Sequence, residues 1–242
     1  MLHLLRKIMN TGTVTEGHEE TAVSDRFRGE LRVRAEACGE CRSCVAVCPS
    51  KALSIEAGVC SVNNRACLFC GRCVEVCERE ALRHTPNFRL AELQGSLATS
   101  AGEILKQRIR QTLGRSLHIR HVDAGSCNAC DFEMAALNNS IYDIQQYGID
   151  FVASPRHADL LMVTGVVTRN LTQALVMTYE AAASPKLVMA VGACAASGQT
   201  FGQTYAIRGS ADALVPVDIY VPGCPPRPQA LIYGLLLAVD RL

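Results

Sequence analysis

The stretch SLHIRHVDAGSCNACDFE, residues 116 to 133, determines how the second half of the chain is organised. A strand-like run at residues 117 to 122 ends in a turn of small residues that presents Cys127 and Cys130, and Glu133 follows three residues later. In open parallel sheets, sites form in the crevice beyond the carboxyl ends of the strands. The turn therefore predicts a site for a soft metal, with further ligands expected after later strands.

From residue 116 to residue 242 the pattern alternates strands with helices. Several strands are continuous apolar runs, as expected when helices cover both faces of a parallel sheet. The last helix opens with prolines, which suit a helix start. We predict strands at 117 to 123, 150 to 153, 159 to 164, 186 to 191 and 217 to 221, and helices beginning near residues 128, 168 and 226. This predicts an α/β domain at residues 116 to 242 with an open, doubly wound parallel sheet of the flavodoxin-like type.

Two later cysteines lie in settings like that of the opening stretch. Cys194 follows the apolar run KLVMAVGA and Cys224 follows VDIYVPG, so both come after predicted strands. Glycines at residues 125, 192 and 223 precede the thiols and would let the backbone approach a bulky group closely. Because parallel strands end at one edge of a sheet, these two thiols and the earlier pair predict a [4Fe-4S] cluster. The alternative is a set of buried structural cysteines.

An internal repeat precedes this domain. The segment ACGECRSCVAVCPSKAL at residues 37 to 53 and the segment ACLFCGRCVEVCEREAL at residues 66 to 82 share the spacing C-x2-C-x2-C-x3-C. The offset is 29 residues throughout, and Glu78 stands where the first copy has Pro49. A fixed offset of this kind indicates a duplicated structural unit. We expect an α+β two-cluster ferredoxin-like domain at residues 31 to 90.

The spacing of the repeat also predicts its ligands. In two-cluster ferredoxins the last cysteine of each run binds the cluster of the other run. Structural zinc also uses four cysteines, but usually as separated C-x2-C pairs. Cys60, between the copies, has no spacing partner and is interpreted as a buried small hydrophobic residue on a hairpin strand. The alternative for Cys60 is a spare ligand or a redox-active thiol. The predicted sets are Cys38, Cys41, Cys44 and Cys77 for one [4Fe-4S] cluster, and Cys48, Cys67, Cys70 and Cys73 for the other.

Composition places limits on the class of protein. The 242 residues, 49% of them hydrophobic, suffice for one or two domains with a sizeable core, and a net charge of +1 gives no case for nucleic acid. Thirteen cysteines in tight C-x2-C runs favour metal over disulfides in the absence of an export signal. The opening MLHLLRKIMN is too short for a signal-peptide core, and no segment reaches the length of a membrane span. We therefore expect a cytoplasmic protein.

Two segments connect or precede the domains. Residues 1 to 30 predict a short amphipathic helix followed by an extended arm. The helix could pack on its own domain or dock on a partner subunit. Residues 91 to 115 predict a helical linker, with a helix over residues 101 to 113 and Gly114 as its stop.

The motifs GSCNACDFE, SPRHADLLMVTG, VGACAASG and VPGCPPRP resemble the small subunit of energy-converting membrane-bound [NiFe] hydrogenases of the formate hydrogenlyase type. That subunit is related to the 20 kDa subunit of complex I. The resemblance covers residues 116 to 242, and the two-residue gap between Cys127 and Cys130 is the hydrogenase form, since complex I has adjacent cysteines there. Residues 1 to 90, with KIMNTGT and FRG, resemble the polyferredoxin subunit of the same complexes. The chain thus looks like a fusion of two neighbouring subunits.

The resemblance implies an electron relay through three [4Fe-4S] clusters. The cluster nearest the active site, the proximal cluster, would face a catalytic large subunit, and its ligands by matching motif are Cys127, Cys130, Cys194 and Cys224. Membrane-embedded subunits and an upstream donor subunit are the other implied partners. They would hold the chain peripherally on the cytoplasmic face of the inner membrane.

The resemblance also points to three residues that do not bind a cluster. Glu133 matches a family glutamate near the large subunit, where it could handle protons, although a carboxylate at a helix start also interacts favourably with the helix dipole. Arg156 and His157, in SPRHAD, could tune a cluster potential or couple it to a proton. A structural histidine is the alternative for His157.

The number of cysteines restricts the chemistry of the chain. Once twelve cysteines are assigned to clusters, Cys60 remains, so a nickel–iron site would have to lie on another polypeptide. The chain has no Walker-type loop, and the turn at residue 125 carries cysteines instead of a dinucleotide fingerprint. The sequence favours an electron-transfer subunit of a group 4 [NiFe] hydrogenase. The alternatives are the equivalent subunit of a complex I-like quinone oxidoreductase without nickel, and a free-standing dicluster carrier or redox sensor.

Overall fold

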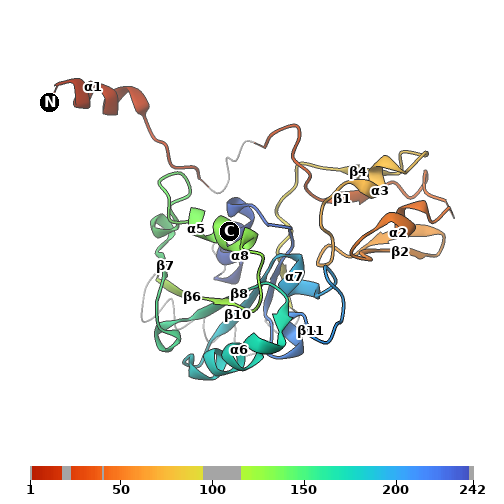
Figure 1. Cartoon of the computed structure of the whole chain (residues 1–242). Coiled ribbons are helices and arrows are strands. Elements are labelled where there is room, and N and C mark those ends of the chain that lie inside the picture. Colours follow the sequence, from red (N-terminus) through yellow and green to blue (C-terminus); the bar gives the residue numbers. More distant parts are fainter. Residues whose placement is uncertain (1, 18–22, 40, 95–115, 240–242) are drawn as a thin grey trace.

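The computed structural model describes residues 2 to 17, 23 to 39, 41 to 94 and 116 to 239. Three regions follow one another along the chain: an N-terminal arm, a small domain built on the cysteine repeat, and an α/β domain (Figure 1). We refer to the last two as the ferredoxin half, residues 23 to 94, and the α/β half, residues 116 to 239.

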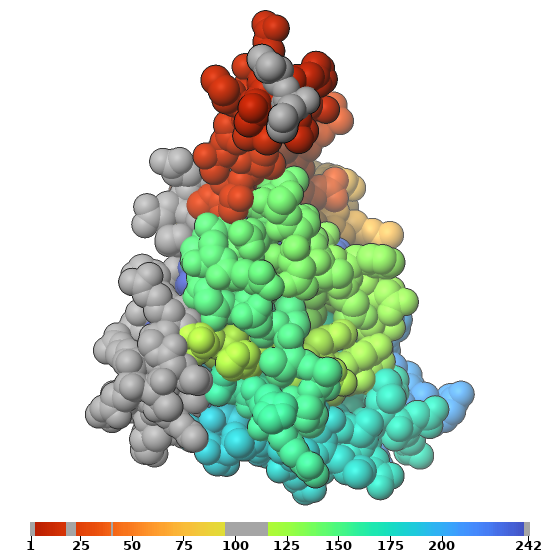
Figure 2. Space-filling view, turned by 90° about the vertical axis from the view of Figure 1, so that its left-hand side faces the viewer, coloured from red at the N-terminus to blue at the C-terminus, as the bar shows by residue number. Residues whose placement is uncertain are grey.

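The N-terminal arm begins with helix α1 (Leu2–Thr11), as the sequence predicts. Its apolar residues are not packed on the rest of the described chain, because Leu4, Leu5, Ile8 and Met9 are 56 to 80% exposed. Figure 2 shows this red segment projecting beyond the green surface of the α/β half. The arm is attached behind the helix, where the backbone N–H of Glu16 donates to the carbonyl of Ile141 at 2.8 Å.

The ferredoxin half contains short elements around the two cysteine runs. Strands β1 and β4 pair in antiparallel fashion, and β2 and β3 form an antiparallel hairpin. The hairpin turns at Ala57 and Gly58, which both have positive φ (49° and 81°), as a type I′ turn requires. The elements are β1 (Leu31–Val33), α2 (Ser43–Val47), β2 (Leu53–Glu56), β3 (Val59–Val62), α3 (Arg72–Glu75) and β4 (Leu82–His84).

The sequence repeat is also a structural repeat. The backbone N–H of Ala52 donates to the Sγ of Cys48 at 3.2 Å, and that of Ala81 donates to the Sγ of Cys77 at 3.3 Å. Both alanines are at most 3% exposed. Cys60 lies on β3 of the hairpin and is 4% exposed, so its predicted burial is confirmed.

The α/β half is built on a six-stranded sheet in the order β5-β12-β10-β8-β6-β7. Strands β6, β7, β8, β10 and β12 are mutually parallel, and their order is compatible with a flavodoxin-like domain. All five lie within one or two residues of the predicted ranges. The strands are β5 (Glu92–Leu93), β6 (Leu117–Asp123), β7 (Ile149–Phe151), β8 (Leu160–Thr164), β10 (Leu187–Val191) and β12 (Ile219–Val221).

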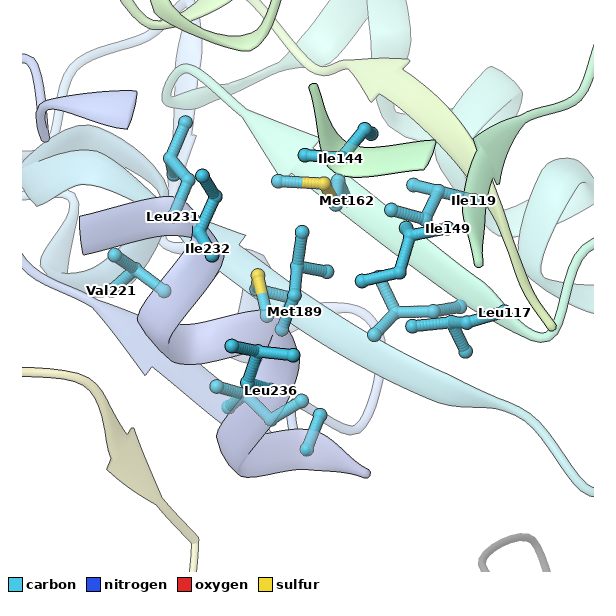
Figure 3. Packing of buried hydrophobic residues seen from close by; sticks show 14 of the residues in the cluster. Leu117, Ile119, Ile144, Ile149, Met162, Met189, Val221, Leu231, Ile232 and Leu236 are labelled. Carbon is cyan, nitrogen blue, oxygen red and sulfur yellow. The ribbon is translucent and has the colours of Figure 1, made fainter. Parts of the chain in front are cut away.

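Helices cover both faces of this sheet, as the continuous apolar strands predict. On one face, α5 (Ala129–Ala136) and α8 (Pro228–Ala238) enclose a core in which Met162 and Met189 of the central strands meet Leu231 and Ile232 of α8 (Figure 3). On the other face lie α6 (Arg169–Ala181) and α7 (Gly192–Ser197). The smaller elements are η3 (Ile144–Tyr147), η4 (Pro155–His157), β9 (Val167–Thr168), β11 (Ile207–Gly209) and η5 (Ala211–Ala213). Within the described ranges, no helix has both the length and the apolar character needed to cross a membrane.

Strand β5 connects the two halves in a way the sequence did not predict. It pairs in antiparallel fashion with the edge strand β12, with Glu92 opposite Tyr220 and Leu93 opposite Ile219. The first residues of the expected helical linker are therefore an edge strand. The helix predicted at residues 101 to 113 lies outside the described residues.

Candidate metal centres

The first thiol set comprises Cys38, Cys41, Cys44 and Cys77, which line one cavity of the ferredoxin half. Cys44 is buried and Cys41 is exposed. Hydrogen bonds from the backbone N–H and hydroxyl of Ser43 lower the pKa of Cys41, and the Arg79 guanidinium lowers it further. The structure thus brings together the four thiols predicted for one cluster.

The second thiol set comprises Cys48, Cys67, Cys70 and Cys73, which line a separate cavity. Burial, reinforced by the charges of the neighbouring thiols, raises the pKa of Cys73 to about 12 and that of Cys67 to about 11. The thiols that line this cavity are the four that the spacing assigns to one cluster, including Cys48 from the first run.

The third thiol set lies at the carboxyl edge of the sheet. Cys127 and Cys130 follow β6, Cys194 lies on α7 directly after β10, and Cys224 follows β12. Burial raises the pKa of Cys130 to about 12, and the charges of the other three thiols contribute to that rise. A hydrogen bond of 2.8 Å from the backbone N–H of Ala193 to the carbonyl of Gly223 holds two of the loops together.

The backbone around the third thiol set leaves room for a bulky group. Gly192 has a φ of +81°, and a Cβ atom at this residue would lie 2.7 Å from the Sγ of Cys130. No side chain larger than glycine fits there without displacing the thiol. The space between the three loops therefore depends on the absence of a side chain at residue 192.

The donor chemistry of the three sets suits iron–sulfur clusters. Thiolates are the soft ligands that such clusters use, and a cubane takes one thiolate for each of four iron atoms, so its ligands surround it. In the described part of the chain, no three His, Cys, Asp or Glu side chains are placed to hold a single metal ion. In the second and third sets, the thiols whose pKa is raised need a cationic partner to be deprotonated near neutral pH.

Glu133 is half-buried on α5, close to the third thiol set. Burial raises the pKa of its carboxyl group, and the positive charge of Arg227 opposes that rise. The helix begins at Ala129, so the acidic residue in its first turn is Asp131. Glu133 lies beyond this first turn, where the helix dipole acts, so the structure gives no support to the helix-dipole explanation.

Arg156 and His157 do not join the third thiol set. Both are exposed and lie in η4, directly before β8. Parallel strands share one direction, so residues that precede β8 lie at the amino edge of the sheet, opposite the cysteines. The structure therefore gives no support to the expected role of these two residues in tuning a cluster.

A polar network beside the third thiol set was not predicted. His121 Nε2 lies 3.1 Å from Asp131 Oδ1 and 2.9 Å from Thr164 Oγ1, and the Ser126 hydroxyl donates to the other carboxylate oxygen of Asp131. These residues flank the C-x2-C motif, but only the fold brings strand β8 beside them. Sequence spacing alone gives no signal for Thr164.

The second and third thiol sets face each other across the boundary between the two halves. A cavity at this boundary is lined by Phe69 of the ferredoxin half and by Cys224 of the α/β half. Leu68 and Phe69, which directly precede Cys70, line this cavity together with Cys224, and the charge of Cys70 contributes to raising the pKa of Cys224. Arg28 Nη1 donates to the carbonyl of Cys70 at the same boundary.

Comparison with known proteins gives two family matches. Residues 127–238 match the NADH ubiquinone oxidoreductase 20 kDa subunit family, and residues 30–78 match a 4Fe-4S dicluster domain. The two matches cover the α/β half and the cysteine repeat, respectively.

Individual relatives come from hydrogenases and from complex I. The chain is 43% identical over 141 residues to a probable membrane-bound hydrogenase subunit, mbhJ, of Pyrococcus furiosus, covering 57% of this chain and 84% of the relative. It is 40% identical over 147 residues to formate hydrogenlyase subunit 7 of Escherichia coli, covering 61% and 56%. It is 45% identical over 113 residues to a subunit of the NADH-quinone oxidoreductase of Citrifermentans bemidjiense, covering 47% and 66%.

Proposed function

We propose that the chain is the electron-transfer subunit of a membrane-associated group 4 [NiFe] hydrogenase complex. It belongs to the family of the NADH ubiquinone oxidoreductase 20 kDa subunit, and a 4Fe-4S dicluster domain precedes the residues that match this family. The complex would be of the formate hydrogenlyase type. Relatives of the chain are subunits of oxidoreductase complexes.

Each thiol set holds one [4Fe-4S] cluster in this proposal. Cys38, Cys41, Cys44 and Cys77 form the first set, Cys48, Cys67, Cys70 and Cys73 the second, and Cys127, Cys130, Cys194 and Cys224 the third. When bound, such clusters supply one-electron redox chemistry. The protein contributes the thiolates, the spacing between the sets and the burial that limits access of water.

The observation that carries the proposal is that the loop before Cys70 and the loop of Cys224 line one cavity at the boundary. A relay needs its carriers close together, and here Leu68 and Phe69 of the second run line the boundary cavity with Cys224, whereas no residue of the first run does. Cys48 lies in the first run but belongs to the second set, and Cys77 lies in the second run but belongs to the first set, so these two cysteines connect the first two sets. The three sets therefore form one continuous series that ends at the α/β half.

The surface around the third set supports a large partner subunit. Cys127 and Cys224 are exposed. Phe132 on α5 is 75% exposed, Phe201 is 58% exposed and Tyr205 is 87% exposed. Thr200, next to Phe201, is hydrogen-bonded to the Cys194 thiol at 3.4 Å. Exposed aromatic residues beside a redox site are typical of a protein interface, here for the subunit that would hold the active site.

The second candidate function is the equivalent place in a complex I-like quinone oxidoreductase without nickel. It is favoured by the 45% identity to a subunit of an NADH-quinone oxidoreductase. The hydrogenase is preferred because Cys127 and Cys130 are separated by two residues, the form that its small subunits share. Both candidates place the chain peripherally on the cytoplasmic face of the inner membrane, held by membrane-embedded partners and supplied by a donor subunit.

The experiment is to isolate the native complex with its large subunit and to determine that subunit's sequence and metal content. The proposal predicts two C-x2-C pairs, bound nickel, and proton reduction driven by a low-potential donor. A large subunit that lacks both pairs and passes electrons to a quinone would contradict the hydrogenase and favour the second candidate. A chain isolated with its clusters but with no large subunit would favour the free-standing carrier.

A further inference from the structure

Two arginines cross the boundary between the halves in opposite directions. Arg65 reaches from the ferredoxin half to Tyr220, and Arg227 reaches from the α/β half to Phe27 and Phe88. Each arginine is within three residues of a thiol of these two sets: Arg65 precedes Cys67 of the second thiol set, and Arg227 follows Cys224 of the third. These contacts are therefore placed to fix one set relative to the other.

The Arg65 contact is the tighter of the two. Its guanidinium carbon lies 3.7 Å from the centre of the Tyr220 ring, and its Nε donates to Glu92 Oε2 at 2.9 Å. A second nitrogen, Nη2, donates to Gln94 Oε1 at 3.4 Å. Tyr220 is itself held, since it is 2% exposed and its hydroxyl donates to Asp212 at 3.1 Å. Arg65 thus covers the β5–β12 pair, because Glu92 and Tyr220 are opposite each other across those strands.

The Arg227 contact is made by a side chain of the α/β half with two aromatic rings of the ferredoxin half. Its guanidinium carbon lies 5.1 Å from the centre of the Phe27 ring and 5.0 Å from that of Phe88. Its Nε donates to Gln229 Oε1 at 2.7 Å, and Gln229 Nε2 donates to Glu16 Oε2 at 2.8 Å. Gln229 is 5% exposed, so the guanidinium is held in a defined place between aromatic rings and a buried amide.

We propose that Arg65 and Arg227 are positioning residues that lock the ferredoxin half onto the α/β half and so fix the separation of the second and third thiol sets. A planar guanidinium can stack flat on a ring while its N–H groups donate hydrogen bonds in a fixed fork geometry. The inference rests on the proposed relay. It adds that the relay distance is set by these two contacts together with the β5–β12 pair.

The test uses the full chain loaded with its clusters. Arg65→Gln and Arg227→Gln, singly and together, should leave the number of clusters unchanged but weaken the spin–spin interaction between the reduced second and third clusters in EPR. Amide hydrogen exchange in β5 and β12 should rise roughly tenfold in Arg65→Gln, since a half-buried cation–ring contact and its hydrogen bonds are lost. Exchange in the central strands β8 and β10 should not change.

Matched variants separate positioning from general destabilisation. Tyr220→Phe keeps the ring and should retain the spin–spin interaction, whereas Tyr220→Leu removes the ring and should weaken it. Arg32→Gln is the arginine control, because Arg32 pairs with Glu30 within the ferredoxin half at 3.1 Å.

An unchanged spin–spin interaction and unchanged exchange in the double arginine variant, with three clusters present, would overturn the inference and leave the proposed function standing. A wild-type chain that binds only two clusters would instead overturn the proposed function. In that case the rates of amide hydrogen exchange in β5 and β12 would still decide whether the two arginines hold the halves together.

Discussion

The thiols of the ferredoxin half come from two short loops, whereas those of the α/β half come from three strand ends that are far apart in the sequence. The loops have little else to stabilise them: the larger buried cluster of the ferredoxin half contains Leu31, Leu53 and Leu82 together with three cysteines. The α/β half has a core of buried aliphatic residues on each face of its sheet. One half is thus organised around its ligands, and the other positions its ligands with an independent core.

The difference predicts different roles for iron in the two halves. Where binding residues form a large part of the core, metal binding contributes directly to folding. Where an aliphatic core already fixes the strand ends, the thiols are preorganised.

Removal of iron should affect the ferredoxin half most. We expect chelation to unfold residues 23 to 84 while the sheet of the α/β half stays folded. Amide hydrogen exchange checks this, with loss of protection in β2 and β3 and retained protection in β8 and β10. Equal loss of protection in all four strands would show that the α/β half also needs its cluster to fold.

Single ligand substitutions should reproduce the contrast on a smaller scale. Cys73→Ser should remove the second cluster and destabilise the ferredoxin half, because Cys73 is 8% exposed and belongs to its core. Cys194→Ser should remove one EPR signal and leave both the fold and the ferredoxin signals intact. Loss of ferredoxin signals in Cys194→Ser would contradict the independence of the third set.

The contrast also explains what the sequence could predict. The repeat and its ligand exchange follow from local spacing, so both thiol sets of the ferredoxin half were predictable. The third set was predictable because apolar runs mark the strands and parallel strands end at one edge. Three features could not be predicted. Strand β5 has only two residues and so shows no periodic pattern. The contact of Arg65 with Tyr220 and that of His121 with Thr164 join residues that lie more than 40 positions apart in the sequence.

Backbone room at the third set can be tested with paired glycine substitutions. Gly192→Ala should abolish the third cluster, because the new Cβ would lie 2.7 Å from the Sγ of Cys130. Gly202→Ala is the control: its φ of +67° imposes a similar backbone cost of about 1 to 2 kcal/mol, but nothing lies within 4 Å of the new atom. Cluster loss in both variants, or in neither, would remove the steric argument.

Titration of Glu133 should give the smallest effect. Its pKa is raised in the folded protein, so between the ordinary carboxyl pKa of about 4.3 and the raised value the folded state binds more protons than the unfolded state. The stability of the wild type should therefore fall as pH rises through this window. Glu133→Gln should lack this fall, and Arg227→Gln should extend it to higher pH, because Arg227 lowers the pKa of Glu133. Denaturant unfolding of the α/β half at several pH values measures both, and identical pH dependence in wild type and Glu133→Gln would contradict the assignment.

The central claim is that three thiol sets each hold a cluster. The most direct measurement is the quantification of iron and sulfide in the purified full chain, combined with an EPR redox titration that counts the reducible centres. The account predicts iron and sulfide for three [4Fe-4S] clusters and three one-electron signals. Two clusters, both lost when the cysteines of the ferredoxin half are substituted, would show that the strand ends of the α/β half hold no cluster.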